Sequence, residues 1–364
     1  MSEHPLRVGL VGANAERSWA KVAHVPALAA LPEFTLTAVG TRRRESAEAA
    51  AQAFGATEAY DDFRQLVRSN SVDIVTVCVR VPSHLDVVMA ALAAGKHVMC
   101  EWPLGRNTEE AEKMAEAARV SGVRTCIGLQ GRMAPAARRA RELLNRGAIG
   151  RPLTASIYVP NTAYGPRAPA YSAYLMDPAN GANVTTISGG HNIDLAQFVL
   201  GGVCELAAWG TTMFPDVELI DPPGRVRRQT PDRLLIQMLH ENGCVTGLEI
   251  AGNRPPGSLF SFQIVGTEGE ITLTGDHAYG SQSSNLKLSS TVEHENPAPL
   301  ASATLQGPPA NVAELYRAFA RDIREGTRTA ADFDHATELT RLVRAVTVAD
   351  QSGVRQRDRA WMRY

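Results

Sequence analysis

The stretch Ala94-Gly95-Lys96-His97-Val98-Met99-Cys100-Glu101-Trp102-Pro103 closes a short apolar run with an acid, a tryptophan and a proline. It follows an Ala-rich amphipathic segment over 83–94, so the run His97–Glu101 has the setting of a strand that follows a helix. Glu101 then lies at the carboxyl end of the strand, where ligands bind in parallel sheets. The alternative is that Glu101 only satisfies backbone donors and that Trp102 fills a core.

The first third of the chain repeats this rhythm of strand and helix. Predicted strands are Leu6–Val11, Thr35–Gly40, Val72–Val79, His97–Glu101 and Thr125–Gln130. Predicted helices cover 18–31, 44–54, 61–69, 83–94 and 107–121, the last starting at Asn107 and stopping at Ser121-Gly122. Repeated βαβ units favour a parallel, doubly wound sheet covered on both faces, which is a Rossmann-type α/β fold.

The pattern changes after residue 130. A helix over 135–147, a strand over 152–160 and a helix over 189–200 precede two predicted hairpins, Asp232–His240 with Cys244–Ala251 and Leu259–Val265 with Glu270–Thr274. Helices over 309–325 and 335–351 close the chain. We expect a nucleotide-binding domain over 1–130 and a second α/β domain over 131–364 with a mostly antiparallel sheet. The final helices are free to pack back on the first domain.

The composition of the 364 residues bounds the classes of function. Hydrophobic residues make up 44% and charged residues 21%, and the net charge of −1 gives no electrostatic case for a nucleic-acid or membrane partner. The apolar runs are strand-sized, and the N-terminus lacks a secretory signal. Five widely spaced cysteines without a CxxC or HExxH motif favour a reducing, cytoplasmic setting and no dedicated metal site.

A degenerate glycine loop follows the first predicted strand. Gly12 stands where a tight turn beneath a pyrophosphate needs a glycine, and Asn14 and Arg17 hold the second and third glycine positions of the usual fingerprint. Asparagine tolerates positive φ better than most residues, so a modified loop that includes Ala15 remains compatible with a dinucleotide. The competing interpretation is a β–α turn that binds nothing.

The second predicted strand ends without the acid that usually holds the ribose of NAD. Thr41, Arg42 and Arg43 follow it instead. Guanidinium groups suit a 2′-phosphate, and arginines at a helix start oppose the helix dipole, so the pattern favours NADP over NAD. The alternative is a solvated basic helix start.

Three groups of motifs in order along residues 6 to about 210 resemble the glucose–fructose oxidoreductase / inositol dehydrogenase / MocA family. They are Ala94–Leu104, then Gly128-Leu129-Gln130-Gly131-Arg132 with Gly147-Ala148-Ile149-Gly150, and then Gly189-Gly190-His191-Asn192-Ile193-Asp194. Within the family, the loop Gly12–Ala20 and the segment Thr185–His191 are similar to the yeast galactose-metabolism repressor-like subgroup. The resemblance implies a Rossmann domain and a C-terminal α/β domain with a large open sheet.

The resemblance also implies a proton-transfer site that this chain keeps only in part. Catalytic relatives use a lysine, an aspartate and a histidine; His191 matches the histidine, while Trp102 and Ile187 stand at the other two positions. His191 is the candidate acid/base because its pKa is intrinsically near neutrality, or else it orients and packs. Asp194 lies one helical turn from His191, where it anchors the site or adds to the charge at the helix start.

Three further side chains are candidates for substrate contacts. Arg132 would hold an anionic or hydroxylated ligand, or form an interdomain ion pair. Gln130 would contact substrate or ribose. Tyr164, in a tyrosine-rich loop, would line a carbohydrate pocket or an interface between copies of the chain. The cofactor set is Gly12, Asn14, Ala15, Thr41, Arg42, Arg43, Glu101 and Trp102.

The sequence therefore predicts an oxidoreductase that uses NADP, or NAD, on a sugar, a polyol or a related hydroxy compound. The alternative is a dinucleotide-sensing regulatory protein without turnover, since the repressor-like subgroup acts through a protein partner. An open sheet would leave a large apolar face bare, and relatives pair such sheets, so we expect a homodimer or tetramer.

Overall fold

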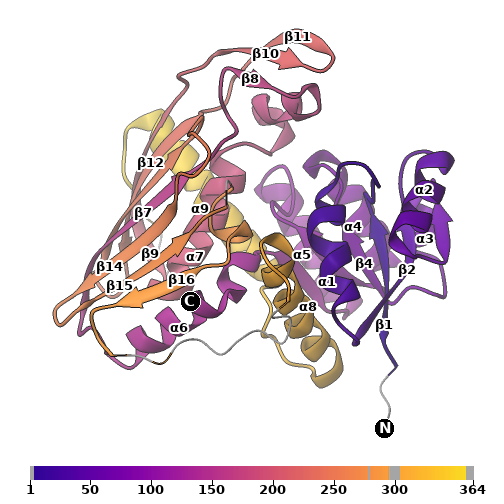
Figure 1. The fold of residues 1–364 in the computed structure, drawn as a ribbon, viewed down its shortest axis with the longest axis horizontal. Helices are drawn as coiled ribbons and strands as arrows, with labels where there is room; N and C mark the ends of the chain where they lie inside the picture. Colours follow the sequence, from indigo (N-terminus) through magenta and orange to yellow (C-terminus); the bar gives the residue numbers. More distant parts are fainter. Residues whose placement is uncertain (1–3, 278, 294, 296–303, 358–364) are drawn as a thin grey trace. The chain divides into compact units, whose positions relative to one another are not determined.

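The computed structural model describes residues 4–277, 279–293, 295 and 304–357. The chain divides into two compact units. The first reaches Gln130 and takes in a later segment that ends at Thr337, whereas the second begins at Gly131 and resumes at Glu338. Figure 1 follows the chain through both units.

The first unit is built on a six-stranded parallel sheet in the order β3-β2-β1-β4-β5-β6. The strand order reverses between β1 and β4, which is the point where ligands bind in doubly wound sheets. All four residues of β4 are buried, as expected for a strand covered on both faces. The strands are β1 (Leu6–Val11), β2 (Phe34–Gly40), β3 (Glu58–Tyr60), β4 (Ile74–Val77), β5 (His97–Glu101) and β6 (Thr125–Gly128).

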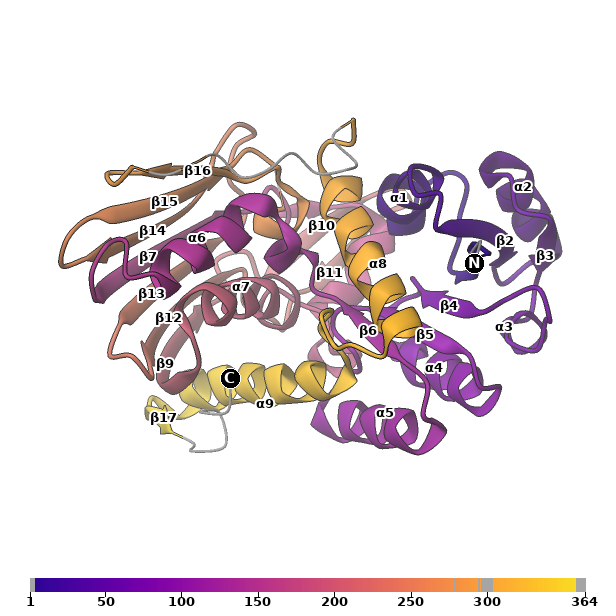
Figure 2. The same cartoon turned by 90° about the horizontal axis from the view of Figure 1, so that it is seen from below.

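Helices lie on both faces of this sheet. In Figure 2, α4 and α5 lie on one side of β4 and β5, and α8 lies on the other; α8 packs against α1 and β6. Asn107 caps α5 by accepting the Glu110 N–H, and Gly122 ends it at φ 67°, which confirms the predicted start and stop. The helices are α1 (Val25–Ala29), α2 (Arg44–Phe54), α3 (Phe63–Leu66), α4 (His84–Ala93), α5 (Thr108–Ser121) and α8 (Pro308–Glu325).

The first unit differs from the prediction in one helix and one strand. The single helix expected over 18–31 is a π-helical segment, Ala20–His24, followed by α1, and Pro26 in the first turn of α1 has no N–H to continue the α-helical ladder. The short edge strand β3 was not predicted, because three half-buried residues carry no clear period.

The second unit contains an eight-stranded sheet in the order β16-β15-β14-β7-β13-β12-β9-β17. Among the described strands of this sheet, β7 and β13 are the one pair that runs parallel. The predicted mostly antiparallel sheet is confirmed. Helix α6 (Pro135–Asn145) packs on β15 and β16 and against α7 (Gly190–Leu200). The strands are β7 (Pro152–Pro160), β9 (Val203–Thr211), β12 (Arg233–His240), β13 (Val245–Ala251), β14 (Phe260–Gly266), β15 (Glu270–Gly275), β16 (Lys287–Ser290) and β17 (Gln356–Arg357).

Both predicted hairpins are confirmed, and β12 shows how the sheet buries one face. Leu234 and Ile236 are buried, whereas Leu235 between them is 49% exposed. In the turn between β12 and β13, the Gly243 N–H bonds to the His240 oxygen, and Gly243 takes φ 84°. Asn242 instead accepts the Cys244 N–H through its side chain.

The sequence did not reveal β9, β16, β17 or a separate three-stranded sheet of β8 (Arg167–Ala168), β10 (Asp216–Ile220) and β11 (Pro223–Arg227). This small sheet is short and half exposed, so it lacks a readable period. A buried ion pair, Arg228 with Asp232 at 2.9 Å, lies beside it. Helix α9 (Phe333–Ser352) precedes the last described strand, β17, and none of the described helices combines the length and apolarity needed to cross a membrane.

Candidate functional site

Gly12 makes the turn at the end of β1 because no larger residue fits there. Its φ is 98°, and a Cβ atom at this position would lie 2.6 Å from the backbone oxygen of Cys78. Its N–H bonds to the Gly40 oxygen at the end of β2. The loop therefore passes closely between the carboxyl ends of two strands, as a pyrophosphate-binding turn must.

Asn14 shapes this loop through its side chain. Its Oδ1 accepts the N–H groups of Glu16 and Arg17 at 2.8 and 2.9 Å, and its backbone oxygen accepts the Ser18 hydroxyl. Asn14 does not make use of its tolerance for positive φ, because it is not among the positive-φ residues. An Asx turn replaces the missing glycine by supplying an acceptor for two loop donors. Ala15 packs against the core beneath the loop.

A donor that sequence reasoning missed lies next in the chain. The Trp19 Nε1–H is buried and has no hydrogen-bond partner in the described structure. A buried unsatisfied donor costs about 1–3 kcal/mol, so it is normally retained for a ligand or water. The only sequence signal was an aromatic residue directly after a nucleotide-type turn.

Thr41, Arg42 and Arg43 follow β2 at the same edge of the sheet. The Thr41 hydroxyl bonds to the Ser46 hydroxyl at 2.6 Å and donates to the Arg43 oxygen. Arg42 and Arg43 are exposed, and neither guanidinium pairs with a described residue. Arg44, in contrast, is held by Glu48. The segment directly after β2 thus offers two uncommitted cations, and none of its first three residues is an acid.

Glu101 ends β5 and Trp102 follows it. Glu101 Oε1 lies 2.9 Å from His24 Nε2 and forms a hydrogen bond with it. The Glu101 side chain is 14% exposed. Trp102 is 6% exposed and joined to Pro103 by a cis peptide bond. This burial is compatible with the alternative in which Trp102 fills a core. Its place directly after β5 is also compatible with a position beside a bound cofactor. Gln130, just past β6, is buried with an unpartnered Oε1 that suits a ligand donor.

In the second unit, Arg132 and Asp194 form a two-pronged ion pair. Arg132 Nε and Nη2 donate to the two Asp194 oxygens at 3.0 and 2.6 Å, with side chains 14% and 2% exposed. The Arg132 guanidinium also lies 5.2 Å from the centre of the Phe198 ring. The alternative for Arg132 was an ion pair between the domains. The ion pair observed lies within the second unit, between Arg132 and Asp194 of α7. Two of the guanidinium donors are committed to Asp194.

His191 lies in the first turn of α7, one turn before Asp194, and is 7% exposed. A π-helical segment, Thr185–Gly189, leads into α7 and carries Ile187 and Ser188. The Ser188 oxygen accepts the Asn192 side-chain amide at 2.8 Å, and Asn192 in turn accepts the Ser281 hydroxyl. In the chain, His191 thus stands between Ser188 and Asn192, two residues of a buried polar cluster that the sequence did not reveal.

Tyr164 belongs to the same cluster. Its hydroxyl bonds to Ser188, and burial raises the pKa of this phenol, so it stays protonated at neutral pH. Tyr164 takes φ 63°, which is unusual for a bulky residue, and its backbone oxygen accepts from Arg228 at 2.8 Å. Strain of this kind concentrates at functional sites. Cluster and strain together single out this loop among the described residues.

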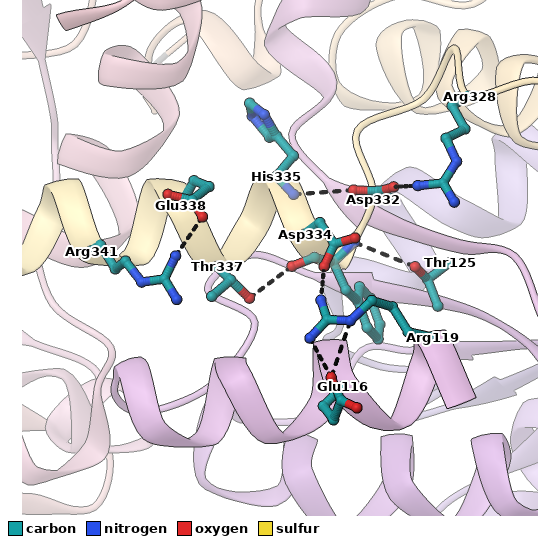
Figure 3. A network of polar contacts seen from close by, with 11 residues as sticks. Glu116, Arg119, Thr125, Arg328, Asp332, Asp334, His335, Thr337, Glu338 and Arg341 are labelled. Atoms are coloured by element: carbon teal, nitrogen blue, oxygen red, sulfur yellow. Dashed lines mark hydrogen bonds and ion pairs between the residues drawn. The ribbon is translucent and has the colours of Figure 1, made fainter. Parts of the chain in front are cut away.

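A second polar network in the first unit is structural. Figure 3 shows Arg119 of α5 between Glu116 and Asp334, with Asp332 capping α9 through the His335 N–H. A cavity of about 50 Å³ lies beside it. These contacts hold the start of α9 against α5 and β6. The negative charges of the acids balance the positive charges of the arginines.

Asp322 of α8 also contributes to the contacts near the start of α9. The backbone N–H groups of Thr329 and Ala330 and the hydroxyls of Thr327 and Thr329 donate to it. Burial by itself would raise the pKa of Asp322, but these donors outweigh burial and lower it. The carboxylate thus holds the end of α8 to the segment before α9.

Comparison with known proteins gives two matching family models. "Oxidoreductase family, NAD-binding Rossmann fold" matches residues 6–129, and "Gal80p, C-terminal domain" matches residues 135–275. The galactose/lactose metabolism regulatory protein of Saccharomyces cerevisiae is 32% identical, over 82% of this chain and 73% of that protein. A dehydrogenase, aclE of Aspergillus oryzae, is also 32% identical, over 74% and 77%.

A solved structure extends the likeness to the whole chain. The super-repressor mutant of Gal80p from Saccharomyces cerevisiae superposes with a TM-score of 0.87 at 27% identity, covering 99% of this chain and 100% of that one. The relatives thus include a regulator and a dehydrogenase at equal identity.

Proposed function

Because this chain belongs to the glucose–fructose oxidoreductase / inositol dehydrogenase / MocA family of oxidoreductases, we propose that it is an NADP-preferring oxidoreductase acting on an alcohol carbon of a sugar, polyol or related hydroxy compound. The observation that carries the cofactor preference is the pair of exposed, uncommitted guanidinium groups of Arg42 and Arg43 at the end of β2. A 2′-phosphate matches these cations, and no acid stands there to hold the ribose hydroxyls of NAD.

The residues of the first unit fit a dinucleotide. Gly12 leaves the space that a Cβ would fill, and the buried Trp19 N–H and Gln130 Oε1 are left for a ligand. Thr41, Arg42 and Arg43 would hold the phosphate of the adenosine half, while Glu101 and Trp102 would face the other half. The cofactor supplies the hydride acceptor or donor when it is bound.

The polar cluster of the second unit would hold the substrate. In the direction of oxidation, a ring nitrogen of His191 would accept the hydroxyl proton of the substrate, and the bound cofactor would supply the hydride acceptor. Tyr164 stays protonated, so it donates a hydrogen bond to a substrate oxygen rather than acting as a base. Asp194 keeps Arg132 in place through two hydrogen bonds, and the Arg132 guanidinium would add positive charge to the site that holds the substrate.

Support for a sugar substrate comes from a relative and from the cluster. A levoglucosan dehydrogenase of Pseudarthrobacter phenanthrenivorans is 27% identical to this chain. Tyr164 supplies a hydroxyl group of the kind that sugar hydroxyls need.

The test of the cofactor preference compares two nucleotides on matched variants. Arg42→Ala should weaken NADPH binding at least about tenfold, or about 1.4 kcal/mol, and leave NADH binding nearly unchanged. Arg44→Ala is the control, because its guanidinium is held by Glu48 in the same segment. Equal loss of NADPH and NADH affinity in Arg42→Ala would contradict the 2′-phosphate assignment.

The test of catalysis follows nicotinamide reduction while NADP⁺ and a panel of sugars and polyols are added. Wild type should reduce NADP⁺ with one class of these compounds, and His191→Asn should lose at least about a hundredfold in kcat while still binding nucleotide. Reduction that His191→Asn leaves intact would remove His191 from the proton-transfer role.

The second candidate function is a dinucleotide-sensing regulator. It is favoured by the two absent catalytic positions, since Trp102 and Ile187 carry no titratable group. Tight NADP binding with no redox change across the panel, together with capture of a protein partner that depends on nucleotide, would favour this candidate over the enzyme.

We also propose that the second unit forms a homodimer through the open face of its sheet. Trp209 of β9 pairs in register with Leu235 of β12, and they are 70% and 49% exposed. Exposed apolar pairs of this kind on a sheet face are normally covered. Light scattering of the purified chain measures the mass directly, and a monomer at micromolar concentration would contradict the proposal.

A further inference from the structure

A buried chain of hydrogen bonds in the first unit ends on Glu101. Thr76 Oγ1 lies 2.9 Å from Tyr316 Oη, Tyr316 Oη lies 2.9 Å from His24 Nδ1, and His24 Nε2 lies 2.9 Å from Glu101 Oε1. Thr76, Tyr316 and His24 are each 0% exposed. The chain joins β4, α8 and the segment after the nucleotide loop to the end of β5.

The three bonds are compatible with a single ordered set of donors. If the Thr76 hydroxyl donates to Tyr316 and Tyr316 donates to His24 Nδ1, then neutral His24 must carry its proton on Nε2 and donates to Glu101. Each hydroxyl and ring nitrogen is thereby used. His24 Nε2 is the ring nitrogen that faces Glu101, and a carboxylate oxygen only accepts, so the neutral ring carries its proton on Nε2 and accepts from the phenol at Nδ1.

Of the two carboxylate oxygens of Glu101, one has no hydrogen-bond partner among the described residues. His24 bonds to Oε1, while Oε2 accepts no hydrogen bond from a described residue, and 14% of the side chain is exposed. A Cβ at position 128 on the neighbouring strand would lie 2.7 Å from Oε1, so Gly128 leaves the space in which the carboxylate sits. The sheet thus makes room for a carboxylate with one satisfied and one open oxygen.

The place of Glu101 in the sheet identifies what the open oxygen faces. β5 lies two strands from β1, on the side away from β2. If the phosphate of the adenosine half binds at the end of β2 and the pyrophosphate binds over the β1 turn, the nicotinamide-ribose half extends toward β4 and β5. That half carries hydroxyl and amide donors that suit a carboxylate oxygen.

Building on the proposed function, we propose that Thr76, Tyr316 and His24 are positioning residues that hold Glu101 so that Oε2 accepts a hydrogen bond from the nicotinamide-ribose half of the bound dinucleotide. Tyr316 acts from α8, more than two hundred residues along the chain from Thr76 and His24. The hydroxyl, rather than the ring, performs this role, because Phe34 packs edge-on against the ring at 5.2 Å and would hold a phenylalanine equally well.

The experiment compares two ligands by calorimetric titration of the whole chain: NADPH, and adenosine 2′,5′-bisphosphate, which lacks the nicotinamide half. Tyr316→Phe and Thr76→Val each remove one hydroxyl from the chain and keep the side-chain bulk. Both should weaken NADPH binding about five- to tenfold and change bisphosphate binding by less than about twofold.

Thr37→Val is the matched control, because it removes a buried hydroxyl from β2 of the same sheet that bonds only to the Val8 and Ser71 oxygens. It should leave both affinities unchanged within about twofold. Thermal unfolding of each variant shows whether it is folded, and Thr76→Val carries the test if Tyr316→Phe is not.

The outcomes separate this proposal from the proposed function. Equal weakening of both ligands would mean a general loss of structure and would overturn the positioning role, as would unchanged NADPH binding in both variants. Wild type that binds neither ligand would instead overturn the nucleotide-binding function itself. A selective loss of NADPH affinity in both chain variants, absent from Thr37→Val, supports the positioning role.

Discussion

Asp194→Asn is the sharpest test of how the second unit holds its polar cluster. The change keeps the shape of the side chain but replaces one acceptor of Arg132 by an amide donor and removes the negative charge. Arg132 is 14% exposed, so its charge would lose an ionised carboxylate partner at a place where little water reaches it. We expect α7 to lose stability while the sheet beside it stays folded.

The magnitude follows from the geometry of the pair. Two charge-assisted hydrogen bonds, at 3.0 and 2.6 Å, are affected, and removal of one partner of a buried ion pair costs about 3–5 kcal/mol. Because Arg132 keeps some exposure and the amide oxygen can still accept one bond, we expect a loss of about 2–3 kcal/mol. Replacing both partners, Arg132→Met with Asp194→Leu, should recover most of it, to within about 1 kcal/mol of wild type.

Amide hydrogen exchange of α7 peptides measures the opening free energy of this helix. Asp216→Asn is the control, because it breaks an ion pair with Arg227 in the same unit whose side chains are 75% and 71% exposed, and it should cost less than about 0.5 kcal/mol. A double variant as unstable as the sum of its single changes would refute the argument, since it would show that Arg132 and Asp194 do not depend on each other.

Three further predictions rest on other parts of the chain. Gly12→Ala places a Cβ 2.6 Å from the Cys78 oxygen and should abolish nucleotide binding, whereas Gly95→Ala, also at positive φ but facing open space, should cost only about 1 kcal/mol of stability by thermal unfolding. Asp322→Asn should destabilise the chain at neutral pH but little at acid pH in urea titrations. The lowered pKa of Asp322 means that its contribution is complete above the unfolded-state pKa and is lost as pH falls through the folded value, so a pH-independent difference would contradict it. Leu235→Arg should shift the chain from dimer to monomer in light scattering, and an unchanged mass would place any interface elsewhere.

The sequence predicted which candidate cofactor residues share one edge of the first sheet. Gly12, the basic residues after β2 and Glu101 were found because a parallel sheet brings the carboxyl ends of its strands to one edge, so local strand ends suffice to group them. The role of Asn14 was not predicted, because an Asx turn and a positive-φ residue are equally compatible with asparagine in a loop. Trp19 was missed because only burial shows that its N–H has no partner.

The sequence by itself determined the α/β fold, the strand ends that meet at one edge of the sheet and the family, since these depend on residue periods and short motifs in neighbouring positions. Tertiary structure alone decided that Tyr316 of α8 completes a chain to Glu101 through His24, that Asp194 takes Arg132, and that Tyr164 bonds to Ser188. The physical reason is that a buried polar group must find a partner wherever packing brings one, and packing joins residues without regard to their distance along the chain.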